Sequence, residues 1–387
     1  MKKKTKTTEF GVRSSEFGVA FLHTPNSRLQ TQLFGVVCCL LFPLCLLPSA
    51  FCHAQAYQLT QFYAAPTFLS PAFAGSGACE RITTNYRIQW SSIPGAFRTY
   101  LLSFDHSIPK KNSGIGFLFV NDKAGSGNLR STTFNAQYSY QLQLTRAWVF
   151  NAGFEAGYAE RNYDFNKFIF GDQIAHGTAT SVEQPIYNKV RYLDLSSGIL
   201  LYSESTWFGF SARHLNRPNQ ALVSEESRLP ILYSVHGGWV IPITNKGEAG
   251  RVFTKHRVTP AFNYRAEKKF DKLDIGYYYA YRSFVENIWP GLGKELPNKN
   301  AYATIVLGIW YRGIPLLKAY QPGYRNDYAL SLLAGMTIDR IKLGYSYDIT
   351  ISRLAGFTAG AQEISLSYQF CDPEMKKRKS AIPCPKF

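Results

Sequence analysis

The stretch Glu363-Ile-Ser-Leu-Ser-Tyr-Gln-Phe370 decides the fold class of this chain, because apolar and polar side chains alternate strictly along it. The apolar positions are Ile364, Leu366, Tyr368 and Phe370, and the polar positions are Glu363, Ser365, Ser367 and Gln369. Successive side chains of a β-strand point to opposite faces, so the pattern predicts a strand with one apolar and one polar face. Such strands build either a membrane barrel, whose apolar face meets lipid, or a soluble sandwich, whose apolar face turns inward.

The same alternation recurs along most of the chain, and no helical periodicity competes with it. We count about 14 candidate strands, at 82–90, 99–105, 115–119, 134–142, 148–158, 190–203, 206–215, 229–241, 256–267, 271–283, 301–312, 328–338, 341–350 and 361–370. Many are long enough to cross a bilayer when tilted, whereas sandwich strands usually have about five or six residues. The sequence therefore predicts an all-β fold, a transmembrane antiparallel β-barrel of about 14 strands.

Side-chain distribution supports the barrel over the soluble domain. Aromatic residues make up 15% of the chain, and many stand at strand ends, as expected of interfacial girdles: Tyr86, Trp90, Tyr100, Trp148, Tyr158, Trp310 and Tyr311. The longest interruptions, at 161–189, 214–228, 243–255 and 284–300, are expected to be extracellular loops. The mean hydropathy of −0.17 keeps a soluble exported β domain open as an alternative.

The N-terminal region predicts export. A basic stretch precedes the apolar run 33–51, and Ala54-Gln55-Ala56 has the small-x-small form of a signal-peptidase site. We therefore expect a signal peptide at 1–56, an irregular lead-in rich in Ala, Pro and Gly at 57–81, an outer-membrane barrel at 82–370, and a periplasmic basic tail at 371–387.

Three of the seven cysteines remain after removal of the signal peptide: Cys79, Cys371 and Cys384. An oxidising compartment favours a disulfide. Cys371 and Cys384 bracket a short polar segment of the tail, so their pairing is our first expectation. A bond from Cys79 to one of these two is the alternative.

The sequence carries no recognisable catalytic or metal-binding motif. The seven His residues lack metal-site spacing, and no nucleophile-elbow, phosphate-loop or CxxC motif occurs. We therefore expect no catalytic residues, no cofactor and no metal, and a protein that is not an enzyme. Gly171-Asp172-Gln173 is either a plain turn or a cation-binding element.

Charged residues on predicted strands offer two readings. Asp194 and Asp348, with Arg87, Arg213 and Arg353, could form ion-pair ladders that plug or tune a lumen, or the carboxylates could form a hydrolytic pair.

The tail differs from everything before it. Four consecutive basic residues, Lys376, Lys377, Arg378 and Lys379, form either a docking element for an acidic periplasmic partner or a solvated tail. The whole chain has a net charge of +17, but an exported protein meets little nucleic acid, so we expect no nucleic-acid partner. Anionic membrane lipid or protein is the more plausible partner of a basic rim.

Several motifs in order resemble one family. They are Gln61-Phe-Tyr-Ala-Ala-Pro-Thr-Phe-Leu-Ser-Pro71-Ala-Phe-Ala-Gly75, Asn85-Tyr-Arg-Ile-Gln-Trp90, Phe170-Gly-Asp-Gln173, Phe208-Gly-Phe-Ser-Ala-Arg-His-Leu215, Gly308-Ile-Trp-Tyr-Arg-Gly313, the closing block from Tyr345 to Phe370, and the ending Cys384-Pro-Lys-Phe387. Together they resemble the PorP/SprF family of outer-membrane proteins of the type IX secretion system and gliding machinery of Bacteroidetes. Ser70 and Gln362 depart from the family pattern, which usually shows Asn and often His there.

The resemblance implies a function in protein secretion and gliding motility. It implies a barrel in the cell outer membrane that binds periplasmic ring subunits and helps to export or anchor cargo with a type B C-terminal sorting domain, such as a surface adhesin. It implies no enzymatic activity. A FadL-like or porin-like transporter of small solutes is the alternative, and that alternative predicts an open lumen.

Overall fold

The computed structural model describes residues 57–77, 79–179, 181–182, 188–222, 226–246, 252–268, 270–289, 302–313, 327–352 and 355–370. The predicted signal peptide and the basic tail lie outside these residues, so both stay predictions. The chain divides into two units, 1–55 and 56–387, and only the second contains described residues.

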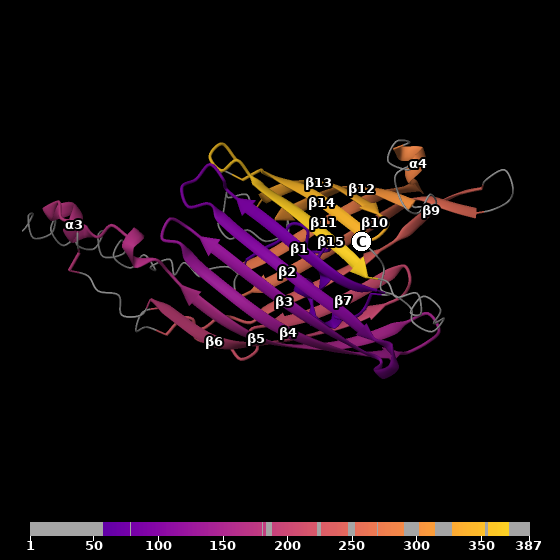
Figure 1. Ribbon diagram of the computed structural model, residues 1–387, viewed down its shortest axis with the longest axis horizontal. Helices are drawn as coiled ribbons and strands as arrows, with labels where there is room; N and C mark the ends of the chain where they lie inside the picture. Colours follow the sequence, from indigo (N-terminus) through magenta and orange to yellow (C-terminus); the bar gives the residue numbers. More distant parts are fainter. Residues whose placement is uncertain are drawn as a thin grey trace, which may run out of the picture. The chain divides into compact units, whose positions relative to one another are not determined.

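The second unit is a closed antiparallel β-barrel (Figure 1). Its strands are β1 Glu80–Gln89, β2 Phe97–Ile108, β3 Ser113–Ala124, β4 Leu129–Gln143, β5 Val149–Asn162, β6 Lys189–Tyr202, β7 Thr206–Arg213, β8 Leu232–Trp239, β9 Ile241–Lys246, β10 Val252–Glu267, β11 Phe270–Phe284, β12 Tyr302–Gly313, β13 Asp327–Ile338, β14 Ile341–Thr350 and β15 Ala361–Phe370.

Each strand of the barrel wall pairs with its neighbour in sequence, and β1 pairs with β15 to close it, with Glu80 opposite Phe370. β8 and β9 take one place in the wall, because β8 pairs with residues 261–267 of β10 and β9 pairs with residues 252–258. Within the described residues the wall therefore has 14 strand positions. The predicted fold class and strand count are confirmed.

The closing strand shows which way the apolar faces turn. Leu366 is 46% exposed on the outer wall, whereas Glu363 is 0% exposed on the lumen side. The apolar face therefore points outward to lipid, as a membrane barrel requires. Among the described helices, none is long and apolar enough to span a membrane.

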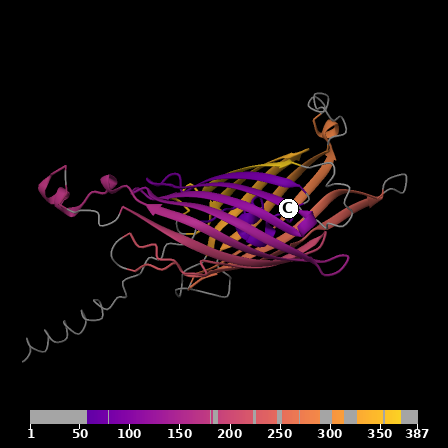
Figure 2. The same cartoon turned by 60° about the horizontal axis from the view of Figure 1, so that its bottom comes forward.

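The two ends of the barrel differ. We call the end at which β1 begins and β15 finishes the proximal end, and the other the distal end. The short helix α3 (Gly171–His176) lies at the distal end, while α4 (Val285–Ile288) and the hairpin of β9 with β10 project from the proximal end (Figures 1 and 2). Our expectation of four extracellular loops is therefore wrong for two of them, since 243–255 and 284–300 connect strands at the proximal end.

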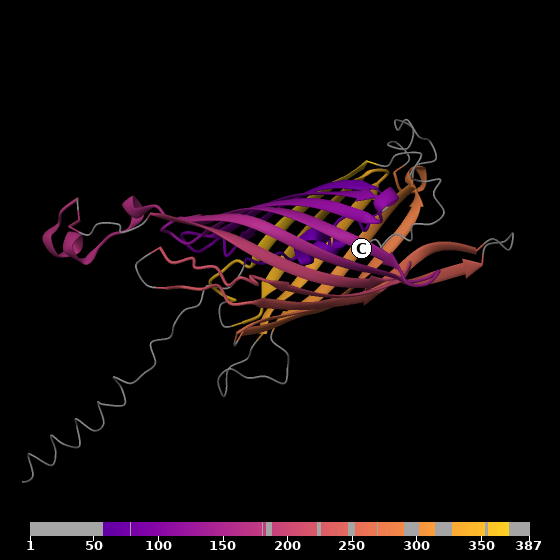
Figure 3. The ribbon, with the colours of Figure 1, turned by 90° about the horizontal axis from the view of Figure 1, so that it is seen from below.

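The remaining helical pieces are single turns. α2 (Pro66–Leu69) and η1 (Pro71–Phe73) precede the barrel in sequence, η2 (Pro109–Lys111) joins β2 to β3, and η3 (Phe165–Lys167) follows β5. Figure 3 shows the first two within the ring of strands.

Candidate functional site: the segment inside the barrel

Residues 57–77, which we call the lumen segment, fill the interior of the barrel. All residues from 59 to 76 are buried, although this stretch precedes the first strand and has no strand periodicity of its own. The sequence predicts only an irregular lead-in here. The structure shows that this lead-in is the core of the molecule.

The lumen segment has few internal backbone hydrogen bonds, because α2 and η1 are each a single turn. Buried carbonyls need partners, and inward-facing polar side chains of the wall supply them. The donors are Gln137 Nε2 to Thr67 O at 2.9 Å, Ser139 Oγ to Ala74 O at 2.6 Å, Asn151 Nδ2 to Ala72 O at 3.1 Å and Ser211 Oγ to Leu69 O at 3.1 Å. The polar face of the strands thus binds protein backbone.

Ser70 is one of the two family departures, and its role is local. Its side chain accepts a hydrogen bond from the Ala72 backbone N–H at 3.3 Å and so caps η1. The other departure, Gln362, is exposed on the outer face of β15.

Glycines in the wall let the lumen segment approach. A Cβ atom on Gly153 would lie 2.3 Å from the backbone nitrogen of Ala72, and one on Gly114 would lie 2.2 Å from the carbonyl oxygen of Ala74. Both distances are shorter than real Cβ contacts. Glycine within a strand is usually unfavourable, and here close backbone approach explains it.

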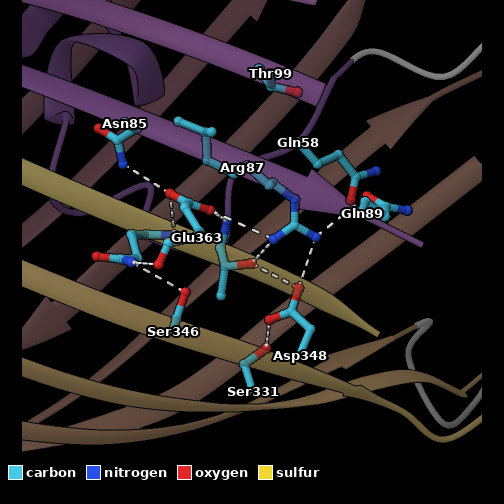
Figure 4. A network of polar contacts seen from close by, with 12 residues as sticks. Gln58, Asn85, Arg87, Gln89, Thr99, Ser331, Ser346, Asp348 and Glu363 are labelled. Atoms are coloured by element: carbon cyan, nitrogen blue, oxygen red, sulfur yellow. Dashed lines mark hydrogen bonds and ion pairs between the residues drawn. The ribbon is translucent and has the colours of Figure 1, made fainter. Parts of the chain in front are cut away.

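The distal third of the lumen holds a buried ionic cluster centred on Asp348 (Figure 4). Arg87 Nη2 donates to Asp348 Oδ2 at 2.8 Å, and Arg312 Nη1 donates to the same oxygen at 2.7 Å. Ser331 Oγ donates to the other carboxylate oxygen at 2.6 Å. Thr60 of the lumen segment joins the cluster, because its hydroxyl donates to Asp348 at 2.8 Å and accepts from both arginines.

Glu363 binds the backbone of the lumen segment. It accepts from the Thr60 backbone N–H at 2.6 Å, from the Gln61 backbone N–H at 3.2 Å and from Asn85 Nδ2 at 2.8 Å. Its other partner is Arg87, whose Nη1 lies 3.6 Å from Glu363 Oε2. One carboxylate therefore holds two successive backbone amides of the lumen segment.

Asp274 extends the ionic cluster to β10 and β11. Its carboxylate lies 3.1 Å from Arg312 Nε, 3.1 Å from Arg265 Nη2 and 3.5 Å from Lys272 Nζ. Lys272 also donates to Gln58 of the lumen segment. Seven charged side chains from six strands thus gather around residues 58–61 of that segment: Arg87, Arg265, Lys272, Asp274, Arg312, Asp348 and Glu363.

The predicted ion-pair ladder is confirmed for one pair, Arg87 with Asp348. Asp194 instead contacts His214 Nδ1 at 2.8 Å, and Arg213 donates to the carbonyl of Phe68. Arg353 lies outside the described residues. Arg312 and Asp274 were missed, although they stand opposite each other in register and on the polar faces of two predicted strands. That pairing of opposite charges was the available signal.

The other side of the lumen is aromatic. Phe62 packs edge-on against Trp310 with ring centroids 5.3 Å apart, and Tyr63 packs against Tyr278 at 4.6 Å. Trp310, which the sequence placed in an interfacial girdle, is only 3% exposed and faces inward. That expectation is wrong, because the lumen segment brings its own apolar surface into the barrel and needs an apolar partner there.

The remaining candidates lie at the ends of the barrel. Gly171-Asp172-Gln173, expected to be a plain turn or a cation-binding element, is the first part of helix α3. The Val182 backbone N–H donates to Asp172 Oδ2 at 2.8 Å and lowers the pKa of that carboxyl. Among the described residues, no group of three or more His, Cys, Asp or Glu could hold a metal ion.

One of the three cysteines that follow the predicted signal peptide lies within the described residues. Cys79 is disulfide-bonded. Cys371, Cys384, Lys376, Lys377, Arg378 and Lys379 lie outside the described residues. The Cys371–Cys384 pairing and the docking role of the tail therefore stay predictions.

A family comparison agrees with the closed wall and its outward apolar face. Residues 51–368 match the family of the type IX secretion system membrane protein PorP/SprF. The chain belongs to this family. Its members are secretion-system membrane barrels of the outer membrane rather than an enzyme family. The earlier resemblance is thereby confirmed, and no curated protein matches the sequence.

Three solved structures are similar to this chain at low identity and low TM-score. The toluene transporter TodX of Pseudomonas putida has 10% identity and a TM-score of 0.41, covering 83% of this chain and 96% of its own. CdiB from Escherichia coli has 7% identity and a TM-score of 0.41, covering 75% and 63%. A KdgM porin in complex with disordered oligogalacturonate has 10% identity and a TM-score of 0.31, covering 75% and 99%.

Proposed function

We propose that this PorP/SprF-family barrel is a docking component of the type IX secretion and gliding machinery. In this proposal it binds periplasmic ring subunits and helps to export or anchor cargo with a type B C-terminal sorting domain, such as a surface adhesin. The observation that carries the proposal is the filled lumen of a barrel that belongs to this family. A barrel whose interior is occupied by its own chain acts through its ends and its outer wall.

The proximal end supports a role in binding periplasmic partners. The first residue of β1, Glu80, and the last residue of β15, Phe370, are register partners at this end, and the tail begins one residue later. The β9–β10 hairpin and α4 project from the same end. Lys110, Lys111, Arg146 and Arg340 are exposed in its turns, which suits an acidic partner.

The transporter alternative has less support. It predicts an open lumen, whereas the lumen segment is buried over 59–76 and is hydrogen-bonded to strands all around the wall. Purified protein in planar bilayers should therefore be electrically silent. Steady conductance by the wild-type protein would favour the transporter.

Affinity purification from detergent-solubilised outer membranes, followed by mass spectrometry, tests the docking function. We expect wild-type protein to recover periplasmic ring subunits, sorting-domain cargo or both. The tail variant Lys376→Gln, Lys377→Gln, Arg378→Gln and Lys379→Gln should recover ring subunits less well. Recovery of neither class by the wild-type protein contradicts the proposal.

A matched control separates the tail from charge in general. Arg217→Gln with Arg228→Gln removes exposed cations at the distal end and should leave recovery of ring subunits unchanged. Equal losses in both variants would show that net charge, and not the tail, supports the interaction.

A further inference from the structure

The outer wall of the barrel carries a row of cations that no structural need explains. Arg98, Lys123 and Arg130 are successive register partners on β2, β3 and β4, and the row continues through Asn162 to Lys189 on β6. Adjacent strands lie about 4.8 Å apart, so the row is about 19 Å wide.

These side chains are on the outer face. Arg98 has the same parity on β2 as the exposed Leu102, and Arg130 the same parity on β4 as the exposed Phe134. Among the described residues, no carboxylate forms an ion pair with Arg98, Lys123, Arg130 or Lys189. Unpaired cations side by side repel one another, so the row lacks an internal stabilising role.

The row beneath the cations is polar, and Asn162 of the cation row donates to its Glu160 at 3.5 Å. Tyr100, Asn121, Thr132, Glu160 and Arg191 follow one another across the same five strands. Glu160 is the one acidic member of this row, and Arg191 Nε lies 2.7 Å from its carboxylate. Asn121 Nδ2 donates to the Thr132 hydroxyl at 2.7 Å. The nearest carboxylate on this face is thus already neutralised.

Below the polar row lies an apolar groove of about 520 Å³. Phe134 and Tyr158 stand opposite each other and form its upper wall, while the next register pair, Ala136 with Ala156, is small and leaves a depression. Phe117 borders the depression on β3. This volume falls in the range of sites that enclose a drug-sized ligand.

The arrangement is confined to one side of the barrel. Barrel strands are tilted, so the matching positions on other strands are the outward-facing residues near their distal ends. On β1, β15, β14, β13 and β12 these residues are uncharged, namely Ile88, Gln362, Ile349, Leu330 and Tyr311. A general need for solubility or for membrane-surface charge would not select one side.

We propose that the wall of β2–β6 binds a phosphorylated glycolipid of the outer leaflet, of the lipid A type. Arg98, Lys123 and Arg130 bind its phosphate groups, and the groove at Ala136 and Ala156 takes an acyl chain. Four residues separate the cation row from the upper wall of the groove along each strand, a distance of about 13 Å that a headgroup and the start of a chain would span. Charge complementarity selects an anionic lipid, because cations near a membrane surface attract anionic headgroups.

The leaflet follows from the orientation of the barrel. An outer-membrane barrel is inserted from the periplasm, so both ends of its chain stay on that side and the distal end faces outward. Arg98, Lys123 and Arg130 stand at the distal ends of their strands. The row therefore lies at the outer leaflet, whose phosphates belong to glycolipid. This inference goes beyond the secretion role and does not depend on it.

Native mass spectrometry of the purified barrel titrated with lipid A tests the proposal. The wild-type protein should bind lipid A, and the variant Arg98→Gln, Lys123→Gln and Arg130→Gln should bind it at least about tenfold more weakly. Lys110→Gln with Lys111→Gln, which removes exposed cations at the proximal end, should bind like the wild type. Lipid A without its phosphates should bind the wild-type protein as weakly as intact lipid A binds the triple variant.

A second variant tests the groove without touching charge. Ala136→Phe with Ala156→Phe fills the depression on a lipid-facing surface and should also weaken binding, while heat-modifiable gel migration verifies that the barrel is folded. Unchanged lipid A binding by either variant overturns the proposal. Equal affinity for phosphatidylglycerol overturns the assignment to glycolipid, and wild-type protein that binds an acidic protein but no lipid A overturns the assignment to lipid.

Discussion

Two arginines on neighbouring strands of the same wall show how differently its two faces use positive charge. Arg87 on β1 points into the lumen, where it is 1% exposed and lies 2.8 Å from Asp348. Arg98, opposite Ile88 in register, points outward, and no carboxylate of the described residues forms an ion pair with it. Both are near the distal end, so height in the membrane does not explain the contrast.

The difference separates structural charge from charge that is available for binding. A buried ion pair that loses one partner leaves an uncompensated charge in a poorly solvated site, whereas an exposed cation keeps its water. The lumen cluster therefore stabilises the segment that fills the barrel. The outer row contributes little to stability and remains free to bind a ligand.

The largest expected effect comes from breaking the inner charge. Arg87→Met should leave Asp348 and Glu363 short of a partner and lower stability by about 3–5 kcal/mol. Arg98→Met should change it by less than about 0.5 kcal/mol. The midpoint of heat-modifiable migration in gels compares the two variants. Similar losses in both would remove the distinction between the two faces.

Removal of the Cys79 disulfide is expected to cause the next largest loss of stability. Cys79→Ser should lower stability by about 2–4 kcal/mol. Glu80 stands opposite Phe370, so the ladder favours Cys371 as the partner over Cys384. Mass spectrometry of non-reduced peptides identifies the pair. A peptide that joins Cys371 to Cys384 would support our first expectation instead.

A change that displaces the lumen segment should open the barrel. Gly153→Val places side-chain atoms where the Ala72 backbone now lies, at 2.3 Å from a Cβ, and should raise conductance in planar bilayers above that of the wild type. Gly335→Val is the matched control, because its Cβ would make an ordinary contact at 3.4 Å. If neither variant conducts, the added side chain has displaced the wall and not the lumen segment.

The smallest expected loss of stability comes from removing the Ser70 cap of η1. Ser70→Ala removes the hydrogen bond to the Ala72 N–H and should lower stability by about 1 kcal/mol, as at other capping positions. Gel migration of the folded form measures it. A loss as large as that of Arg87→Met would show that Ser70 does more than cap η1.

Much of the wall was predictable because its signal is local. Strict alternation placed the strands, and strand length with aromatic content turned the apolar face of Ile364 and Leu366 outward. Charged residues on polar faces suggested ion pairs in the lumen without saying which residues pair. Trp310 was misplaced, since alternation alone does not say that part of a lumen is apolar. No sequence pattern indicated the contacts between the lumen segment and the inward-facing side chains of the wall.

The sequence by itself determined that this chain forms a membrane barrel with polar side chains inside, because alternation, strand length and strand number can all be read along the chain. Only the tertiary structure decided what those polar side chains bind. Thr60 meets Glu363 across 303 positions of sequence, and Arg98, Lys123 and Arg130 form a row only when register aligns three strands. Contacts between distant residues arise from barrel closure and register, and neither leaves a periodic trace in the chain.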